Sequence, residues 1–421
     1  MNSSLSHEPH DNLTRSTPLE STGYTCGPKL ESFHSSYAQV HGWASLQVCV
    51  FGSIANVLNI AVLTRREMHS PTNMILTGLA VADLLVMIEY IPYAIHMYLY
   101  QRSRRDTFTY GWGVFVLFHS NFGQVCHTIS ICLTVTLAIW RYIAVAYPQK
   151  NREWCSNTRT VLTIVGAYVF CPILCVPLYV TTEVRPQVEL LDEEGMNVNL
   201  TKLNGTASLD GATNTTLYFV KLTETARMHA ALKKMNFWIY SVVIKLIPCL
   251  ALTVLSFKLI RVLVEAKRRR RKLTAKNTDI KMSNGKDGCE KPSGKKRRKG
   301  ADKEKQTDRT TKMLLAVLAL FLITEFPQGI LGLFSVILGT SFFNTCYVML
   351  GDVIDILTLI NSAINFILYC AMSRQFRTTF NQLFCSRLWR LIGRWMPVPH
   401  QPMENNGITG TNHTITQVTQ V

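Results

Sequence analysis

Residues 74–99 read MILTGLAVADLLVMIEYIPYAIHMYL, an apolar run of 26 residues with only two acidic side chains. A helix of about 20 mainly apolar residues is long enough to cross the hydrocarbon core of a bilayer. Further runs of sufficient length occupy residues 42–64, 112–140, 160–181, 236–260, 313–338 and 345–371. We therefore predict an all-α fold, a bundle of seven transmembrane helices over residues 42–371, and not a soluble protein in which every run is a core helix.

The composition of the chain agrees with this fold. Of its 421 residues, 48% are hydrophobic and only 17% are charged, and the mean hydropathy is +0.13. These values are typical of a helical membrane protein and unusual for a soluble one. Residues 1–41 are polar and contain no apolar core of a secretory signal, so we expect the first span to act as its own insertion signal.

The distribution of positive charge predicts the orientation in the membrane. Residues 261–312 contain 20 Lys and Arg against 7 Asp and Glu, and cytoplasmic loops carry such an excess. The loop after the third span and the tail after the seventh agree, whereas Arg102, Arg104 and Arg105 fall on the other side. We expect a plasma-membrane protein with its N-terminus outside. Between two spans, the basic runs favour anionic lipid or an acidic partner over nucleic acid.

Glycosylation sequons support the same orientation. Five of them fall in the two segments that we place outside, 1–41 and the long loop after span four, and their asparagines are Asn2, Asn12, Asn199, Asn204 and Asn214. Asn412 begins another sequon in the predicted cytoplasmic tail, which shows how often this short pattern arises by chance.

Outside the spans we predict little folded structure. Residues 267–308 of the third cytoplasmic loop and residues 396–421 of the tail are poor in apolar side chains, so neither should fold alone. Residues 372–395 differ, because aromatic and aliphatic side chains recur every four residues between arginines: Phe376, Phe380, Phe384, Leu388 and Ile392. This spacing predicts an amphipathic eighth helix on the cytoplasmic membrane surface. Cys385 is either a palmitoylation site there or a buried free thiol.

Most of the 12 cysteines lie within spans, where cysteine acts as a small hydrophobic residue. Cys26 and Cys346 fall in or beside segments that we place outside the cell, where disulfides persist. We predict that these two residues form a disulfide.

Four polar side chains interrupt the apolar runs, namely Asp83, Arg141, Asn361 and Asn365. Burying such a group in hydrocarbon costs several kcal/mol unless it faces a protein interior, so intramembrane polar residues indicate a functional site.

The chain resembles the rhodopsin-like (class A) G protein-coupled receptors over about residues 42–385. The motifs that carry the resemblance occur in the expected spans and order: Asn56, Asp83 in Leu79-Ala80-Val81-Ala82-Asp83, Trp140-Arg141-Tyr142, Pro248, Pro327 and Asn365-Phe366-Ile367-Leu368-Tyr369. Trp140 replaces an acid, Phe366 a proline, and Thr324-Glu325-Phe326-Pro327 the usual Cys-Trp-x-Pro. These variants are similar to those of invertebrate myosuppressin and FMRFamide-like receptors, with the sex-peptide receptor group a close relative.

The resemblance implies a function: extracellular binding of an amidated, RFamide-like neuropeptide activates a heterotrimeric G protein. The family usually joins the third span to the following outer hairpin by a disulfide, but both cysteines are missing here, so we expect a less constrained outer loop. A membrane enzyme is the third class considered, but the spans contain no His/Glu metal spacing, nucleophile elbow or phosphate loop, so we predict no enzymatic activity. We interpret His119 and His127 as packed or hydrogen-bonded side chains and not as metal ligands.

The resemblance also assigns roles to the polar residues of the spans. Asp83, Ser130, Asn361 and Asn365 match a sodium site, and their oxygens suit a hard cation; a hydrogen-bonded network without an ion is the alternative. Sodium is the only cofactor that the sequence suggests.

Two further sets follow from the family's motifs. Arg141, Tyr142 and Tyr369 are the expected contacts for the G protein, although Arg141 could instead only anchor the end of its helix. Ile131, Pro248, Phe321 and Pro327 match the activation switch, in which the prolines provide hinges; simple core packing is compatible with this role.

The ligand site is expected at the outer end of the bundle. There the family geometry brings together four carboxylates and three aromatic rings: Glu89, Glu325, Asp352, Asp355, Tyr93, Tyr98 and Phe326. Carboxylates bind a guanidinium strongly, and aromatic rings bind the phenyl group of an Arg-Phe-amide terminus. The alternative for Glu325 is an internal ion pair with Lys245.

An ion-coupled transporter or channel is the other function class that a seven-span bundle with buried Asp and Asn allows. No inverted repeat is visible in the sequence, which favours a receptor.

Overall fold

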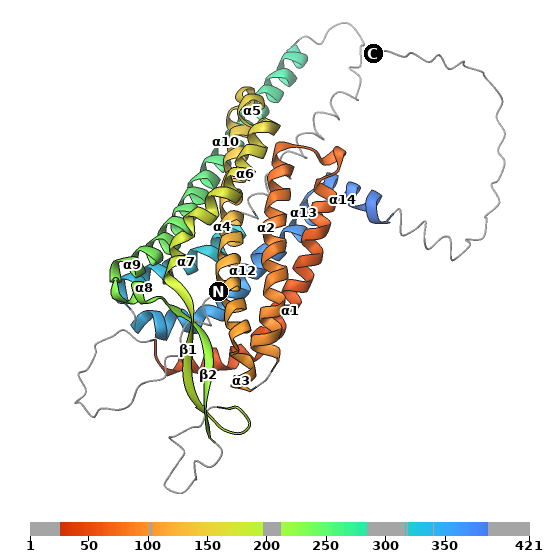
Figure 1. Cartoon of the computed structure of the whole chain (residues 1–421). Coiled ribbons are helices and arrows are strands. Elements are labelled where there is room, and N and C mark those ends of the chain that lie inside the picture. Colours follow the sequence, from red (N-terminus) through yellow and green to blue (C-terminus); the bar gives the residue numbers. More distant parts are fainter. Residues whose placement is uncertain are drawn as a thin grey trace, which may run out of the picture. The chain divides into compact units, whose positions relative to one another are not determined.

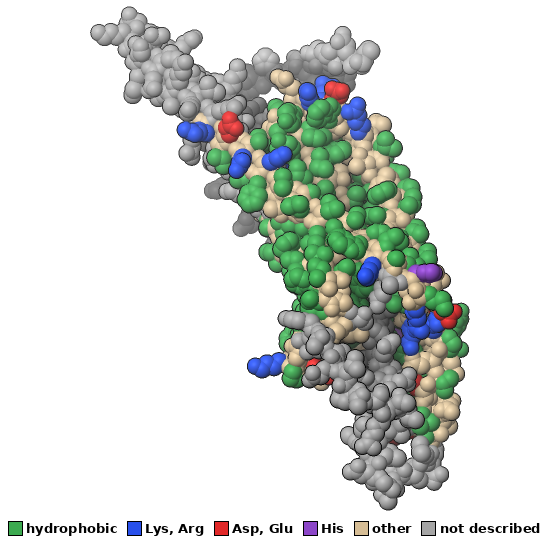
Figure 2. All heavy atoms as spheres, turned by 90° about the vertical axis from the view of Figure 1, so that its left-hand side faces the viewer, with side chains coloured by type: hydrophobic (Ala, Val, Ile, Leu, Met, Phe, Trp, Pro, Cys, Tyr) green, Lys and Arg blue, Asp and Glu red, His purple; other side chains and the backbone are tan. Residues whose placement is uncertain are grey.

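The computed structural model describes residues 26–100, 103–196, 212–283, 316, 319–339 and 341–385, and within them lie seven helices long and apolar enough to cross a membrane (Figure 1). They are Pro28–Leu63, Pro71–Leu99, Tyr110–Ala146, Asn157–Thr181, Lys234–Glu265, Ala319–Gly339 and Phe343–Ala371. Hydrophobic side chains cover the middle of the face shown in Figure 2, and charged ones gather toward its two ends. The predicted seven-helix fold is confirmed.

Several spans contain more than one helical segment. Span one is α1 (Pro28–Leu63), span two is α2 (Pro71–Ala94) with the π-helix Ile95–Leu99, span three is α4 (Tyr110–Ala146), and span four is α6 (Asn157–Leu174) with α7 (Val176–Thr181). Span five joins α9 (Ala230–Trp238), the π-helix Ile239–Leu246 and α10 (Ile247–Ser283). Span seven joins the π-helix Phe343–Tyr347, the turn Val348–Leu350, α12 (Gly351–Ala363) and α13 (Asn365–Met372). The short helices are Arg66–Met68, α3 (Arg104–Thr107), α5 (Pro148–Trp154), α8 (Glu224–Met228) and α14 (Arg374–Phe380).

Local sequence signals explain where two of these helices begin. The Ser70 hydroxyl accepts a hydrogen bond from the Asn73 amide at 3.2 Å, and Pro71 takes the first helical position of α2. Ser156 caps α6 in the same way. A serine cap accepts a hydrogen bond from an unpaired amide at a helix start, and a proline at the first position has no N–H that would need a partner.

A two-stranded antiparallel hairpin is the main feature outside the helices. Strands β1 (Thr182–Leu191) and β2 (Thr213–Leu222) pair from Thr182 opposite Leu222 to Leu191 opposite Thr213. The hairpin lies at the end of the bundle where α4 begins (Figure 1). We call this the hairpin end.

The hairpin is anchored to the start of span three without a disulfide. The Tyr218 amide donates to the Phe108 carbonyl at 2.9 Å, and the Phe108 ring lies 4.7 Å from that of Phe219. Arg104 bonds Glu189 on β1 at 2.7 Å. These contacts replace the covalent tie whose absence predicted a loose loop. They also explain why Arg104 is tolerated on the side with less positive charge.

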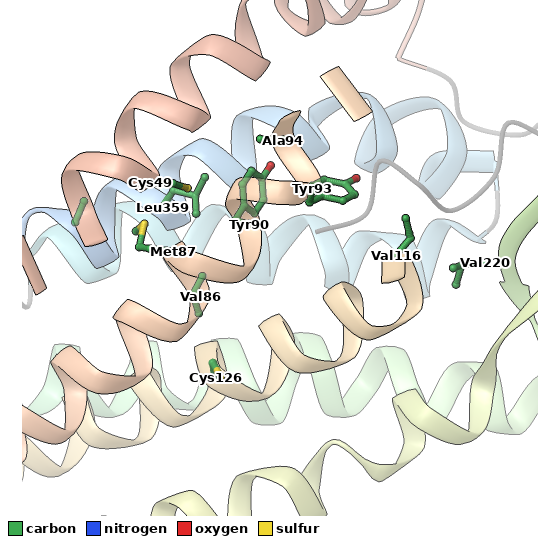
Figure 3. Packing of buried hydrophobic residues seen from close by; sticks show 11 residues of the cluster. Cys49, Val86, Met87, Tyr90, Tyr93, Ala94, Val116, Cys126, Val220 and Leu359 are labelled. Atoms are coloured by element: carbon green, nitrogen blue, oxygen red, sulfur yellow. The ribbon is translucent and has the colours of Figure 1, made fainter. Parts of the chain in front are cut away.

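The buried hydrophobic cluster shown in Figure 3 joins the hairpin end to the middle of the bundle. Tyr90 and Tyr93 of α2 lie at its centre, with Cys49 of α1 and Leu359 of α12 on one side and Val116 of α4 on another. Five elements thus contribute to one core, because β2 adds Val220. This core fixes the rotation of α2, which carries three of the predicted site residues, Asp83, Glu89 and Tyr93.

The start of the third cytoplasmic loop differs from the prediction. Helix α10 continues to Ser283, whereas the composition predicts an unstructured loop from residue 267. Residues 284–315 and 317–318 lie outside the described part, as do residues 1–25 and 386–421.

The eighth helix is present as α14 and the π-helix Asn381–Cys385. Phe376 in α14 is buried against Tyr369 of the bundle and is therefore not part of a membrane-facing stripe. The chain divides into two compact units at residue 380, and the seven spans belong to the first.

Candidate functional site

Asp83 lies at the centre of a polar cluster in the middle of the bundle. Ser130 of α4 donates to one carboxylate oxygen at 2.8 Å, and Asn365 of α13 donates to the other at 3.1 Å. Asp83 is buried, and each of its oxygens has a donor. Spans two, three and seven are therefore joined through one carboxylate, as the polar residues of the sequence predict.

A small cavity adjoins this cluster, and we call it the Asp83 cavity. Its lining includes the four residues of the expected sodium site and two of the expected switch: Asp83, Ser130, Asn361, Asn365, Ile131 and Phe321. Carboxylate, hydroxyl and amide oxygens suit a hard cation. In this arrangement, however, the hydroxyl of Ser130 and the amide of Asn365 donate hydrogen bonds to the carboxylate. That is the geometry of the ion-free network.

A second cavity lies between the Asp83 cavity and the hairpin end, and we call it the hairpin-side cavity. Polar residues of spans two, three, five, six and seven line it: Glu89, His119, Gln124, His127, Tyr240, Gln328 and Asp355. Glu89 accepts a hydrogen bond from His119 Nδ1 at 2.5 Å, and Tyr93 stacks on the His119 ring at 3.9 Å. The predicted ligand residues Glu89 and Asp355 thus meet in one cavity, and Tyr93 supports its wall.

Glu325 is part of a buried triad with His127 and Lys245. Lys245 Nζ donates to Glu325 Oε2 and to His127 Nε2, the latter at 2.6 Å. His127 Nε2 lies 3.1 Å from Glu325 Oε2. Lys245 and Glu325 are both completely buried. The internal ion pair, which was the alternative for Glu325, is therefore present, and Glu325 does not line the hairpin-side cavity.

Two other predicted ligand residues pair with each other instead of lining this cavity. Tyr98 donates to Asp352 at 2.8 Å, and His34 of α1 lies 3.9 Å from the same carboxylate. Asp352 is buried, so it fastens the start of α12 to spans one and two. The disulfide between Cys26 and Cys346 lies in the same region, with a Cα–Cα distance of 5.5 Å, and joins the residues that the sequence predicts.

Phe326 is the clearest correction to the predicted ligand site. Its side chain is 48% exposed, whereas that of its neighbour Glu325 is completely buried. Successive residues of a helix point about 100° apart, so Phe326 can face outward although Glu325 faces inward. Phe326 therefore belongs to the outer surface of the bundle and not to the ligand site.

The π-helix in span five explains how Lys245 reaches the interior. Pro248 lacks an amide hydrogen and cannot donate to the carbonyl of Ile244, which favours a widened turn just before it. Span six comes close at this level because of two glycines. A Cβ on Gly329 would lie 3.2 Å from the Lys245 Cβ, and one on Gly332 would lie 2.2 Å from the Ser241 Oγ.

The expected G-protein contacts lie at the opposite end of α4. Within the described part of the chain, the buried Arg141 Nε makes no hydrogen bond. Trp140, which replaces the usual acid, donates from Nε1 to Thr160 of α6 at 3.1 Å and so serves packing between helices. Tyr369 is buried, and Tyr142 packs against Tyr147 with ring centroids 6.2 Å apart.

The modification sites are only partly described. Asn214 is exposed on β2. Asn2, Asn12, Asn199 and Asn204 lie outside the described residues, as does the side chain of Cys385. Of the two switch prolines, Pro248 is half-buried and Pro327 is exposed.

Sequence reasoning missed Gln124, Tyr240 and Gln328, and it treated His119 and His127 only as packed or hydrogen-bonded side chains. Both histidines are indeed hydrogen-bonded, each beside a glutamate. The rule that singles out Asp83, namely an ionisable or amide group in an apolar run, also applies to Gln124, His119, His127 and Gln328. If it is applied to every such residue, this rule identifies most of the polar residues that line the hairpin-side cavity.

Comparisons with known proteins agree with this arrangement. The model of the family described as serpentine type 7TM GPCR chemoreceptor Srw matches residues 43–287 and 290–387. The chain is 30% identical to the G-protein coupled receptor dmsr-1 of Caenorhabditis elegans, over 89% of this chain and 73% of that protein. It is 25% identical to the sex peptide receptor of Drosophila melanogaster (86% and 76% covered) and 24% identical to the FMRFamide receptor of the same fly (87% and 57% covered). The chain therefore belongs to the seven-transmembrane G protein-coupled receptors and is a multi-pass membrane protein.

Proposed function

We propose that this receptor binds an amidated peptide of the Arg-Phe-amide type at the hairpin end and activates a heterotrimeric G protein at the opposite end. The observation that carries the proposal is the hairpin-side cavity, a buried polar site facing the end of the bundle that bears the hairpin. The printed names of two relatives, the FMRFamide receptor and the sex peptide receptor, support a peptide ligand.

The cavity is rich in hydrogen-bond acceptors. It contains the carboxylates of Glu89 and Asp355, and its lining also includes two acceptor atoms, Gln328 Oε1 and His119 Nε2, that are buried without a hydrogen-bond partner among the described residues. His119 Nδ1–H donates a hydrogen bond to Glu89, so Nε2 of the neutral ring carries no proton and is an acceptor. A guanidinium has five donors and no acceptor, which makes it the natural complement to such a site.

We expect Asp355→Asn to lower the potency of a synthetic Arg-Phe-amide peptide roughly 30-fold or more, because losing one partner of a buried charge pair costs about 2–5 kcal/mol. A peptide with citrulline in place of arginine has no charge to lose, so the variant should respond to it about as wild type does. Both responses are measured as G-protein nucleotide exchange in membranes. Asp352→Asn is the matched control, since Asp352 bonds to Tyr98 and does not line the cavity. An equal loss for both peptides in Asp355→Asn would rule out guanidinium recognition.

We propose that the hairpin end is extracellular and that the protein lies in the plasma membrane. The exposed Asn214 on β2 is available for glycosylation, and the Cys26–Cys346 disulfide at this end requires an oxidising compartment. The basic segment 267–272 lies within α10 toward the opposite end, where anionic lipid would attract it.

At the cytoplasmic end we propose that Arg141 contacts the G protein, with Tyr142 and Tyr369 beside it. The buried Nε without a hydrogen bond in the described residues supports this role, because an orphaned charged donor favours an incoming acceptor. We also propose that Cys385 is palmitoylated.

We propose that the Asp83 cavity binds sodium in the resting receptor. The oxygens of Asp83, Ser130, Asn361 and Asn365 supply the ligands once Ser130 and the amide of Asn365 turn their oxygens inward. Sodium chloride should then lower the affinity of the peptide for wild type relative to N-methylglucamine chloride at the same ionic strength. Asp83→Asn should remove this difference, and an unchanged sodium effect in the variant would identify the cluster as an ion-free network.

A further inference from the structure

We infer that His127, Lys245 and Glu325 are positioning residues that hold the receptor in its resting arrangement and make G-protein activation depend on the hairpin-side cavity. The inference does not depend on which peptide binds, because it concerns the wall between the two cavities.

The triad occupies the boundary between the cavities. His127 lines both of them, so its ring separates the hairpin-side cavity from the Asp83 cavity. Ile131, one helical turn further along α4, lines only the Asp83 cavity. In span six, Gln328 lines the hairpin-side cavity and Phe321 the Asp83 cavity, with Glu325 between them in sequence. A structural change in one cavity must therefore be transmitted through the layer that contains the triad to reach the other cavity.

The triad joins the three helices at this level through charge. Lys245 in span five bonds both to His127 in span three and to Glu325 in span six, and it is completely buried. Separating a completely buried ammonium from its carboxylate costs several kcal/mol. Spans five and six can therefore move apart here only if both charges find new partners together, so two discrete arrangements are favoured over gradual movement.

The surrounding backbone is shaped to bring these charges together. The π-helix Ile239–Leu246 turns Lys245 inward, and Gly329 lets span six approach so closely that any Cβ there would meet Leu246 at 2.9 Å. One turn toward the hairpin end, Gln328 donates to Tyr240 of the same π-helix. This second link borders the hairpin-side cavity, so a group entering that cavity contacts the link directly and the triad just beneath it.

The test compares agonist-free nucleotide exchange per surface receptor in wild type, Lys245→Met/Glu325→Gln and His127→Gln. The double variant removes both charges together, which avoids a stranded ion. His127→Gln keeps the Lys245–Glu325 ion pair but changes the side chain that separates the two cavities. Tyr168→Phe is the control: it deletes a 2.8 Å hydrogen bond from Tyr168 to the Gly78 carbonyl, between spans four and two, and neither residue lines either cavity.

We expect basal exchange to rise about fivefold or more in the double variant, since fivefold is the lower end of common allosteric coupling factors. The half-maximal concentration of a synthetic Arg-Phe-amide peptide should fall in parallel. His127→Gln should show a smaller rise, and Tyr168→Phe should match wild type. A merely structural triad would lower the number of surface receptors without raising exchange per receptor.

Three results would overturn the inference. The first is basal exchange at the wild-type level in both variants, and the second is basal exchange below wild type although the variants reach the cell surface in wild-type numbers. The third is failure of both variants to reach the cell surface while the Tyr168→Phe control does. If wild type ignores the peptide, the proposed ligand is wrong, but the basal measurements still decide the role of the triad.

Discussion

Lys245→Met alone is expected to remove most of the receptor from the cell surface. The substitution leaves Glu325 completely buried with only His127 beside it. Breaking a buried ion pair by deleting one partner typically costs about 3–5 kcal/mol, which is a large part of the stability of a folded protein. Surface labelling of intact cells and the midpoint of thermal unfolding in detergent both measure this loss.

Lys258→Met is the matched control for this prediction, because it makes the same chemical change at an exposed position of the same span. It should leave surface number and unfolding midpoint nearly unchanged. Adding Glu325→Gln to Lys245→Met should restore much of the lost receptor, since both charges then disappear. Wild-type behaviour of Lys245→Met alone would show that the bundle does not need the ion pair.

Gly332→Ala is expected to destabilise the contact between spans five and six. The added Cβ would lie 2.2 Å from Ser241 Oγ and 3.0 Å from Ser241 Cβ, and Ser241 is completely buried. Overpacking of this kind costs about 1–3 kcal/mol, because neighbouring backbone must shift. The thermal unfolding midpoint and the surface number should both fall.

The compensating change is Ser241→Gly, which removes the atoms that the new methyl group meets. The double variant Gly332→Ala/Ser241→Gly should therefore be more stable than Gly332→Ala alone, a coupling that two independent sites would not show. Gly166→Ala is the control, since a Cβ there meets nothing within 4 Å. Equal stability of Gly332→Ala and Gly166→Ala would contradict the close approach of the two helices.

The four acidic residues of the predicted ligand site do not lie together in the structure. Sequence reasoning grouped Glu89, Glu325, Asp352 and Asp355 as one anionic site. The structure divides them among three environments: the hairpin-side cavity for Glu89 and Asp355, the triad for Glu325, and a tie between helices for Asp352. Only the first of these environments suits a ligand.

The sequence by itself determined the number of spans, their order, and the polar residues that face inward. Each of these follows from a constraint on single segments, because a chain in hydrocarbon must satisfy its backbone within a helix and turn its polar groups away from lipid. The pairing of Cys26 with Cys346 follows from a similar local argument about compartment.

Only the tertiary structure decided which polar side chains meet. Each residue turns a helix by roughly 100°, so a widened turn such as Ile239–Leu246 reorients every side chain relative to its neighbours. The approach of spans five and six further depends on atoms absent from Gly329 and Gly332. Lys245 faces Glu325, and Phe326 faces outward, because of these rotations and distances between helices, which depend on residues far apart in the chain.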